Sequence, residues 1–223
     1  PIKSSAASDV YKRQRVNILN KSTNNFSQED LKKLQFKYEA ALQVLKTHLE
    51  ILIKDYDMSN HTKSVEHVNA RIKSIDSALG KLEKRNYDIT LENLEEHIHD
   101  MVGVRLVCPF EDDVYEMVDL IKSSDLLQVC HEKDYIENPK ESGYSSYHII
   151  VKVPVSFKDD IEFIDAEIQV RTLAMDAWAA LEHELQYKSN GSVTKRERDE
   201  LRECAQEFRR IENKMLTLKK GLR

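Results

Sequence analysis

Residues 167–172, Glu-Ile-Gln-Val-Arg-Thr, combine an acid, an amide and a cation at alternating positions. Every second side chain of a β-strand points to the same face, so Glu167, Gln169 and Arg171 would lie together. A carboxylate, an amide and a guanidinium on one face suit a site that binds a metal ion and phosphate groups. An ordinary solvent-exposed strand face is the commoner explanation of alternation alone.

A second acidic residue, Asp100, precedes a mainly apolar run that extends to Cys108. Mg²⁺ prefers one or two carboxylates together with substrate phosphates, and Asp100 can supply one of them. Arg105, within the same run, offers a flat cation that can stack on a nucleotide base. Taken alone, the segment is better explained as an acid at the start of a strand and an arginine in an ion pair.

A polar loop follows and reads Lys-Glu-Ser-Gly-Tyr-Ser-Ser-Tyr-His over positions 140–148. Tyr144 comes directly after a glycine, where the loop should join a strand, and its ring can offer a base a stacking surface. Lys140 and His148 can contact phosphate. A tyrosine that only packs beside the approach to a hairpin is the structural alternative.

Three further cations stand upstream of these motifs. Arg71, Lys73 and Lys81 fall in a segment, 63–85, whose apolar spacing predicts a helix. On such a helix they lie within an arc of about 160° and could present their charges to a triphosphate. A solvated basic face is the more frequent meaning of this pattern.

The elements that must position these residues follow from the periodicity of the apolar residues. Helix spacing, with a predicted N-cap at Ser27 for the first helix, predicts helices over 28–55, 63–85, 91–99, 112–123, 173–187 and 194–220. Short β-branched runs predict strands over 101–108, 126–131, 148–155 and 161–171. Because helices flank a strand-rich centre, the expected fold class is α+β, with a mixed sheet and a long C-terminal helix.

Composition narrows the functional class. The chain has 223 residues, of which 33% are charged, and its net charge is −5. This acidic balance argues against a large nucleic-acid interface, although a nucleotide needs only a local cluster of cations. Only five glycines and four prolines argue against a turn-rich β-sandwich.

Cysteines and termini carry weaker signals. The cysteines, Cys108, Cys130 and Cys204, are odd in number and lack metal-ligand spacing, which favours a reducing cytoplasmic compartment. No apolar run approaches the roughly 20 residues of a membrane span and no signal peptide is evident, so no membrane partner is expected. Residues 1–14 are unpatterned and are interpreted as a non-native or disordered segment.

In their order and combination, these segments resemble the synthetase domain of the RelA/SpoT-type alarmone enzymes, in particular the small stand-alone alarmone synthetases of the RelP-like branch. The resemblance spans residues 64–188, and several ordered motifs are far more specific than one phosphate-loop pattern. The motifs are Arg-Ile-Lys-Ser at 71–74, Asp-Met-Val-Gly-Val-Arg at 100–105, Asp-Tyr-Ile at 134–136, Gly-Tyr-Ser-Ser-Tyr-His at 143–148, Glu-Ile-Gln-Val-Arg-Thr at 167–172 and Trp-Ala-Ala-Leu-Glu-His at 178–183.

The resemblance implies a nucleotidyltransferase-like mixed sheet. It also implies transfer of pyrophosphate from ATP to the ribose 3′-hydroxyl of GDP or GTP, which makes the alarmones of the stringent response. On the donor side, it implies that Arg71 and Arg105 sandwich the adenine of ATP and that Lys73 and Lys81 approach its phosphates. It assigns Mg²⁺ to Asp100.

On the acceptor side, the resemblance implies that Tyr144 stacks on the guanine. Glu167 would be the second metal carboxylate and the candidate general base. Four more side chains would position the guanine nucleotide: Lys140, His148, Gln169 and Arg171. Ser145 stands where the family usually has a longer side chain, which weakens the case for one contact to an acceptor phosphate.

Other activities remain as alternatives. His99-Asp100 resembles the metal dipeptide of the family's hydrolase domain, but further His and Asp ligands upstream are lacking, so synthesis without hydrolysis is expected. A toxin-like relative would pyrophosphorylate adenine nucleotides or tRNA, and the acidic balance disfavours tRNA. A catalytically silent nucleotide-binding module is disfavoured because both Asp100 and Glu167 are present.

The last predicted helix carries an apolar stripe in steps of three and four, which is a heptad seam. The stripe consists of Leu201, Cys204, Phe208, Ile211, Met215, Leu218 and Leu222. We favour a partner helix over packing on the same domain, and the small alarmone synthetases are homotetramers. Residues 15–190 are therefore expected to form the catalytic domain with its N-terminal helices, and 191–223 an oligomerisation helix.

Overall fold

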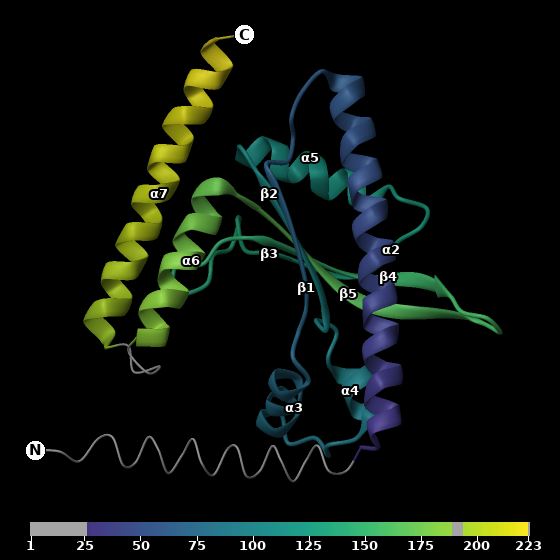
Figure 1. Cartoon of the computed structure of the whole chain (residues 1–223). Coiled ribbons are helices and arrows are strands. Elements are labelled where there is room, and N and C mark those ends of the chain that lie inside the picture. The colour runs from purple at the N-terminus through teal and green to yellow at the C-terminus, as the bar shows by residue number, and fades with distance from the viewer. Residues whose placement is uncertain (1–25, 189–193, 223) are drawn as a thin grey trace, which may run out of the picture.

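A computed structural model describes residues 26–188 and 194–222, and Figure 1 shows their arrangement. The element order is α2 (Gln28–Asn60), β1 (His67–Ile72), α3 (Ile75–Lys84), α4 (Leu91–His97), β2 (Val102–Cys108), α5 (Glu111–Lys122), β3 (Gln128–Asp134), β4 (Tyr147–Ser156), β5 (Ile161–Thr172), α6 (Leu173–Lys188) and α7 (Lys195–Gly221). The interpretation of residues 1–14 lies outside the described residues.

The five strands form one mixed sheet in the order β1-β2-β5-β4-β3. β2 and β5 run parallel in the middle, and every other neighbouring pair is antiparallel. A mixed sheet flanked by helices and a long C-terminal helix is the predicted α+β fold class, which is thereby confirmed.

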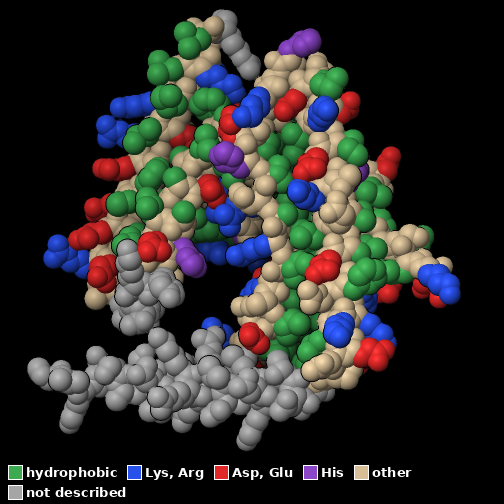
Figure 2. All heavy atoms as spheres, in the orientation of Figure 1, with side chains coloured by type: hydrophobic (Ala, Val, Ile, Leu, Met, Phe, Trp, Pro, Cys, Tyr) green, Lys and Arg blue, Asp and Glu red, His purple; other side chains and the backbone are tan. Residues whose placement is uncertain are grey.

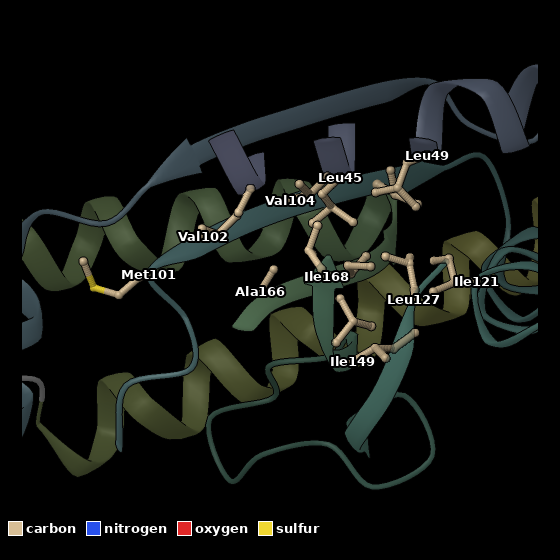
Figure 3. Packing of buried hydrophobic residues seen from close by; sticks show 14 of the residues in the cluster. Leu45, Leu49, Met101, Val102, Val104, Ile121, Leu127, Ile149, Ala166 and Ile168 are labelled. Atoms are coloured by element: carbon tan, nitrogen blue, oxygen red, sulfur yellow. The ribbon is translucent and has the colours of Figure 1, made fainter. Parts of the chain in front are cut away.

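The hydrophobic core lies between the sheet and the helices α2 and α5. Figure 3 shows Leu45 and Leu49 of α2 beside Val104 and Ile168 of the two central strands, and all four side chains are at most 1% exposed. Fully burying one such side chain stabilises the fold by about 1.5–3 kcal/mol. Because burial alternates along β5, the intervening polar side chains point away from this core, as the alternation predicts.

The prediction of one helix over 63–85 is wrong. The segment forms the edge strand β1, a short turn, and then α3, which begins after Ser74, whose hydroxyl accepts a hydrogen bond from the backbone N–H of Ser77. Val68 and Ile72 are four residues apart, a spacing that places two side chains on one face of a helix and also on one face of a strand. Antiparallel pairing with β2 decides for the strand.

The other predicted elements are confirmed with boundaries shifted by a few residues. The largest shifts are in α2, which begins at Gln28 as predicted but continues to Asn60 instead of ending near 55, and in β3, predicted over 126–131 and found at Gln128–Asp134. Sequence periodicity is weak in β3 because it is the opposite edge strand and most of its side chains are exposed.

The two C-terminal helices lie side by side at one end of the sheet (Figure 1). The indole Nε1 of Trp178 in α6 donates a hydrogen bond to the carbonyl of Leu201 in α7 at 3.0 Å. Next to this contact, Gly143 approaches Ala205 so closely that a Cβ on the glycine would lie 2.6 Å from the alanine Cβ. Helix α7 therefore packs against both α6 and the loop that carries Tyr144. Among the described residues, no helix is long and apolar enough to span a membrane.

Candidate active site

A cavity of about 280 Å³ opens on the face of the sheet that α2 and α5 leave free. Its lining comes from β1, β2, β5 and the turns beside them: Asn69, Ala70, Arg71, Lys73, Asp100, Gly103, Val104, Arg105, Glu167 and Gln169. Gly103 pairs with Arg71 on one side and with Glu167 on the other. Because glycine carries no side chain, the space between those two residues stays open.

Asp100, in the turn before β2, is the meeting point of two lysines. Its Oδ2 accepts hydrogen bonds from Lys73 Nζ at 2.7 Å and from Lys81 Nζ at 2.5 Å. Burial favours the neutral acid, but the two ammonium groups outweigh it and hold the pKa of Asp100 below its ordinary value. Burial also lowers the pKa of Lys73. Asp100 is therefore a carboxylate in a concentrated positive field.

The placement of the upstream cations on one helix face is a second error of the helix prediction. Arg71 belongs to β1, Lys73 follows that strand, and Lys81 lies on α3. Arg71 and Arg105 nonetheless line the same cavity from neighbouring strands. Arg71 pairs with Gly103, which is two residues before Arg105, so the two arginines are diagonal neighbours. Diagonal neighbours of this kind are about 7–8 Å apart, within reach of long side chains.

Glu167, near the centre of β5, is the second carboxylate of the cavity. Its Oε1 contacts His148 Nδ1 at 3.0 Å and its Oε2 accepts a hydrogen bond from Gln169 Nε2 at 2.6 Å. Burial raises the pKa of Glu167, but the hydrogen bonds from His148 and Gln169 prevail, so its pKa lies below the ordinary value. Glu167 is thus ionised and oriented at neutral pH.

A chain of hydrogen bonds leads from Glu167 to Arg171. Since a carboxylate only accepts, His148 carries its proton on Nδ1, and its Nε2 accepts from the Tyr144 hydroxyl at 2.9 Å. Arg171 Nη2 donates to the same hydroxyl at 3.0 Å. Burial raises the pKa of Tyr144, so the phenol stays protonated. The chain fixes the ring of His148 against Glu167.

Lys140 lies outside this cavity. Its ammonium stands 4.7 Å from the ring centroids of both Tyr144 and Tyr135, which is cation–π geometry. It also lines a second cavity of about 260 Å³, between the loop 139–145 and α7. A base that stacks on Tyr144 would have to share the ring with Lys140 or displace it.

Asp176, on the first turn of α6, is a residue of this site that sequence reasoning missed. Its Oδ1 accepts from Arg105 Nη1 at 3.1 Å and from Arg171 Nη1 at 3.4 Å. Its place five residues after Arg171, at the strand-to-helix junction, was the only local signal. The pairing with Arg105 bridges 71 positions of sequence and depends on the tertiary structure.

The architecture and the motifs have known counterparts. Residues 70–192, more than half of the chain, match the family model described as a region found in RelA / SpoT proteins. The chain belongs to the RelA/SpoT family. It is 41% identical to the GTP pyrophosphokinase YwaC of Bacillus subtilis over 86% of this chain and 91% of that protein. The GTP pyrophosphokinase YjbM of the same species is 32% identical over 80% and 83%, respectively.

Solved structures of the family superpose on most of the fold. The small alarmone synthetase 2 of Bacillus subtilis has a TM-score of 0.78 and 40% identity, covering 86% of this chain and 99% of that one. The small alarmone synthetase 1 of the same species, bound to its product pppGpp, has a TM-score of 0.80 and 28% identity, covering 88% and 100%. The RelA/SpoT resemblance and the nucleotidyltransferase-like sheet predicted from the motifs are thus confirmed.

Proposed function

We propose that this protein is an ATP:GDP/GTP 3′-pyrophosphotransferase that makes (p)ppGpp. The observation that carries the assignment is the pair of carboxylates, Asp100 and Glu167, facing one cavity whose walls also hold Arg71, Lys73 and Arg105. Relatives of similar length are named GTP pyrophosphokinases, and one related structure holds pppGpp. The acceptor O3′ attacks the β-phosphorus of ATP, the bond between that phosphorus and the α–β bridging oxygen breaks, and AMP leaves.

The donor nucleotide is held by the residues of β1, β2 and α3. Arg71 and Arg105, diagonal neighbours on the cavity wall, take the two faces of the adenine, since guanidinium planes stack on aromatic rings. Lys73 and Lys81 turn from Asp100 to the triphosphate. Both lysines contact the same oxygen of Asp100, so they lie beside the carboxylate that would hold the metal ion.

The carboxylates Asp100 and Glu167 fit a Mg²⁺ site. The described residues contain no group of three or more His, Cys, Asp or Glu side chains arranged for a metal. Two carboxylates on a cavity wall nevertheless match the usual Mg²⁺ site, in which substrate phosphates and water complete the shell. When bound, the ion would neutralise charge that develops on the transferred phosphoryl oxygens.

Glu167 is the general base of this scheme. It is ionised, and its two oxygens are oriented by His148 and Gln169. The proton of the acceptor 3′-hydroxyl passes to Glu167 as O3′ attacks. The remaining acceptor contacts are assigned to Lys140, Tyr144, His148, Gln169 and Arg171. Hydrogen bonds link His148, Tyr144, Arg171 and Gln169 to one another, and the Lys140 ammonium lies over the Tyr144 ring. These side chains therefore lie together next to Glu167.

Synthesis without hydrolysis is part of the proposal. The side chains of the dipeptide His99-Asp100 have separate partners in this structure. His99 Nδ1 contacts Asp165 Oδ2 at 2.6 Å, whereas Asp100 binds the two lysines. A relative that is 41% identical over 86% of this chain is named a GTP pyrophosphokinase, which supports synthesis.

Self-association through α7, as a homotetramer, completes the proposal. The predicted stripe divides into two parts: Leu201 and Phe208 are partly buried against the same chain, while the distal part is exposed. Exposed apolar side chains on the outer faces of α7 and α6 are Ile211, Met215, Leu218, Leu222, Leu181 and Leu185. Figure 2 shows green side chains gathered along α7. Exposed apolar side chains that recur along a helix in this way are typical of an interface between copies.

The test of the activity is a direct transfer assay. Purified protein is mixed with Mg²⁺ and ATP carrying a labelled β-phosphate, together with GDP, GTP, AMP or tRNA in separate reactions. We expect label in ppGpp or pppGpp and stoichiometric AMP. Transfer only to an adenine nucleotide or only to tRNA would replace the guanine assignment, and absence of transfer to every acceptor would refute the enzyme assignment.

A further inference from the structure

Asp176 joins two arginines that come from different strands. Arg105 lies on β2 and Arg171 on β5, and these strands are parallel neighbours in which Arg105 pairs with Gln169. The single oxygen Oδ1 of Asp176 receives Nη1 of both arginines, at 3.1 and 3.4 Å. The carboxylate therefore stands over the boundary between the two strands, where the proposed donor and acceptor sites meet.

The chemistry of the pair requires an anion at this point. The Arg171 side chain is only 3% exposed. Its pKa is lowered chiefly by burial and further by the charge of Arg105, while Asp176 acts in the opposite direction. Gln169 and Tyr144 also accept hydrogen bonds from Arg171, but both are neutral. Within the described residues, Asp176 is the only carboxylate ion-paired with either arginine.

Each arginine retains a buried donor without a partner in the described part of the chain. Nε of Arg105 and Nε of Arg171 are buried and have no hydrogen-bond partner among the described residues. A guanidinium is planar and rigid, so fixing one terminal nitrogen restricts the direction of the others. Asp176 thereby sets the planes of both arginines and leaves Nε free.

We infer that Asp176 is a positioning residue that holds the donor-side Arg105 and the acceptor-side Arg171 in their binding orientations together. The inference rests on the proposed function for the roles of the two arginines. It predicts that one substitution weakens the binding of both nucleotides, although Asp176 itself touches neither. An acid in the first turn of a helix also stabilises the helix dipole, and a purely structural role of that kind would lower thermal stability without a selective effect on substrates.

The test compares Asp176→Asn, which keeps the shape and removes the charge, with Asp176→Glu, which keeps the charge. The matched control is Glu200→Gln on α7, where an exposed carboxylate is ion-paired with Arg196 one turn before it. We expect Asp176→Asn to raise KM for ATP and for GDP by about ten- to hundredfold each, because the acceptor shared by the two arginines loses its charge. Asp176→Glu should recover most of this loss, kcat should change less than KM, and Glu200→Gln should behave as wild type.

A double-mutant cycle assigns the effect to the arginine. In an Arg105→Ala background, Asp176→Asn should no longer change KM for ATP but should still change KM for GDP. Calorimetric binding of a non-hydrolysable ATP analogue, and separately of GDP, repeats the comparison without turnover. A failure of the proposed reaction would therefore leave this measurement intact.

Three results would overturn the inference. They are unchanged binding of both nucleotides by Asp176→Asn, loss of affinity for only one of them, and loss of thermal stability with both affinities intact. If Asp176→Asn does not fold, Asp176→Ser, which also removes the charge, decides: a raised KM for both nucleotides at wild-type melting temperature supports the positioning role, and wild-type KM values refute it.

Discussion

Replacing Tyr144 by Phe removes one oxygen atom and separates two roles for this ring. If the ring serves only as a stacking surface for the guanine, Phe should replace it with little loss, and only Ala should fail. The Tyr144 hydroxyl has a separate role in the structure, because it accepts a hydrogen bond from Arg171 at 3.0 Å and lies 2.9 Å from His148 Nε2. We therefore expect Phe to fail as well.

The size of the effect follows from these contacts. The Arg171 side chain is 3% exposed, so water does not readily replace the lost acceptor. A hydrogen bond to a charged group contributes about 1.5–3 kcal/mol, which corresponds to a loss of about ten- to 150-fold in kcat/KM. Truncation to Ala also removes the ring on which the guanine is proposed to stack, for a further loss of about 1–3 kcal/mol. Tyr144→Phe should thus fall well below wild type, and Tyr144→Ala should fall lower still.

The assay is the initial rate of labelled (p)ppGpp formation at varied GDP and saturating ATP. Tyr135→Phe is the matched control, because its ring packs edge-on against Tyr144 and His148 but its hydroxyl makes no hydrogen bond among the described residues. Wild-type kcat/KM for Tyr144→Phe, within about twofold, would refute the argument and restore simple stacking.

The remaining predictions concern the two carboxylates and the last helix. Asp100→Asn should lower kcat by about a thousandfold or more at saturating Mg²⁺ without unfolding the protein. EDTA should abolish the turnover of the wild type. Near-normal activity in either experiment would contradict the metal assignment. Glu167→Gln should reduce kcat far more than ATP affinity. Because the pKa of Glu167 lies below its ordinary value, its carboxylate form persists on mild acidification, and loss of the base should limit turnover only at acidic pH. Light scattering should show that the double variant Ile211→Glu and Met215→Glu dissociates the assembly. These side chains are 61% and 53% exposed on their own chain, and burying each one contributes up to about 1.5–3 kcal/mol. Lys214→Glu on the same helix should leave the assembly intact, and a wild type that is monomeric at micromolar concentration would exclude the interface.

The sequence alone determined the strands that carry the chemistry. In β5, β-branched residues alternate with Glu167, Gln169 and Arg171. Because alternate side chains of a strand point to opposite faces, burial of the β-branched residues places these three polar side chains together on the other face. The apolar run after Asp100 likewise predicts the buried strand β2. The order of the motifs indicated the family, and with it the mixed sheet.

Only the tertiary structure decided what the upstream cations do. Val68 and Ile72 fit a helix and a strand equally well, so local pattern could not separate them, and backbone pairing with β2 made the segment a strand. That pairing is what brings Lys73, with Lys81 from the following helix, onto Asp100. The contacts of Asp176 with Arg105 and Arg171 likewise could not be predicted from the sequence, because the two arginines come together only through the register of β2 against β5. Local periodicity specifies which face a side chain takes, whereas contacts between residues distant in sequence depend on strand pairing and helix packing, which no local window contains.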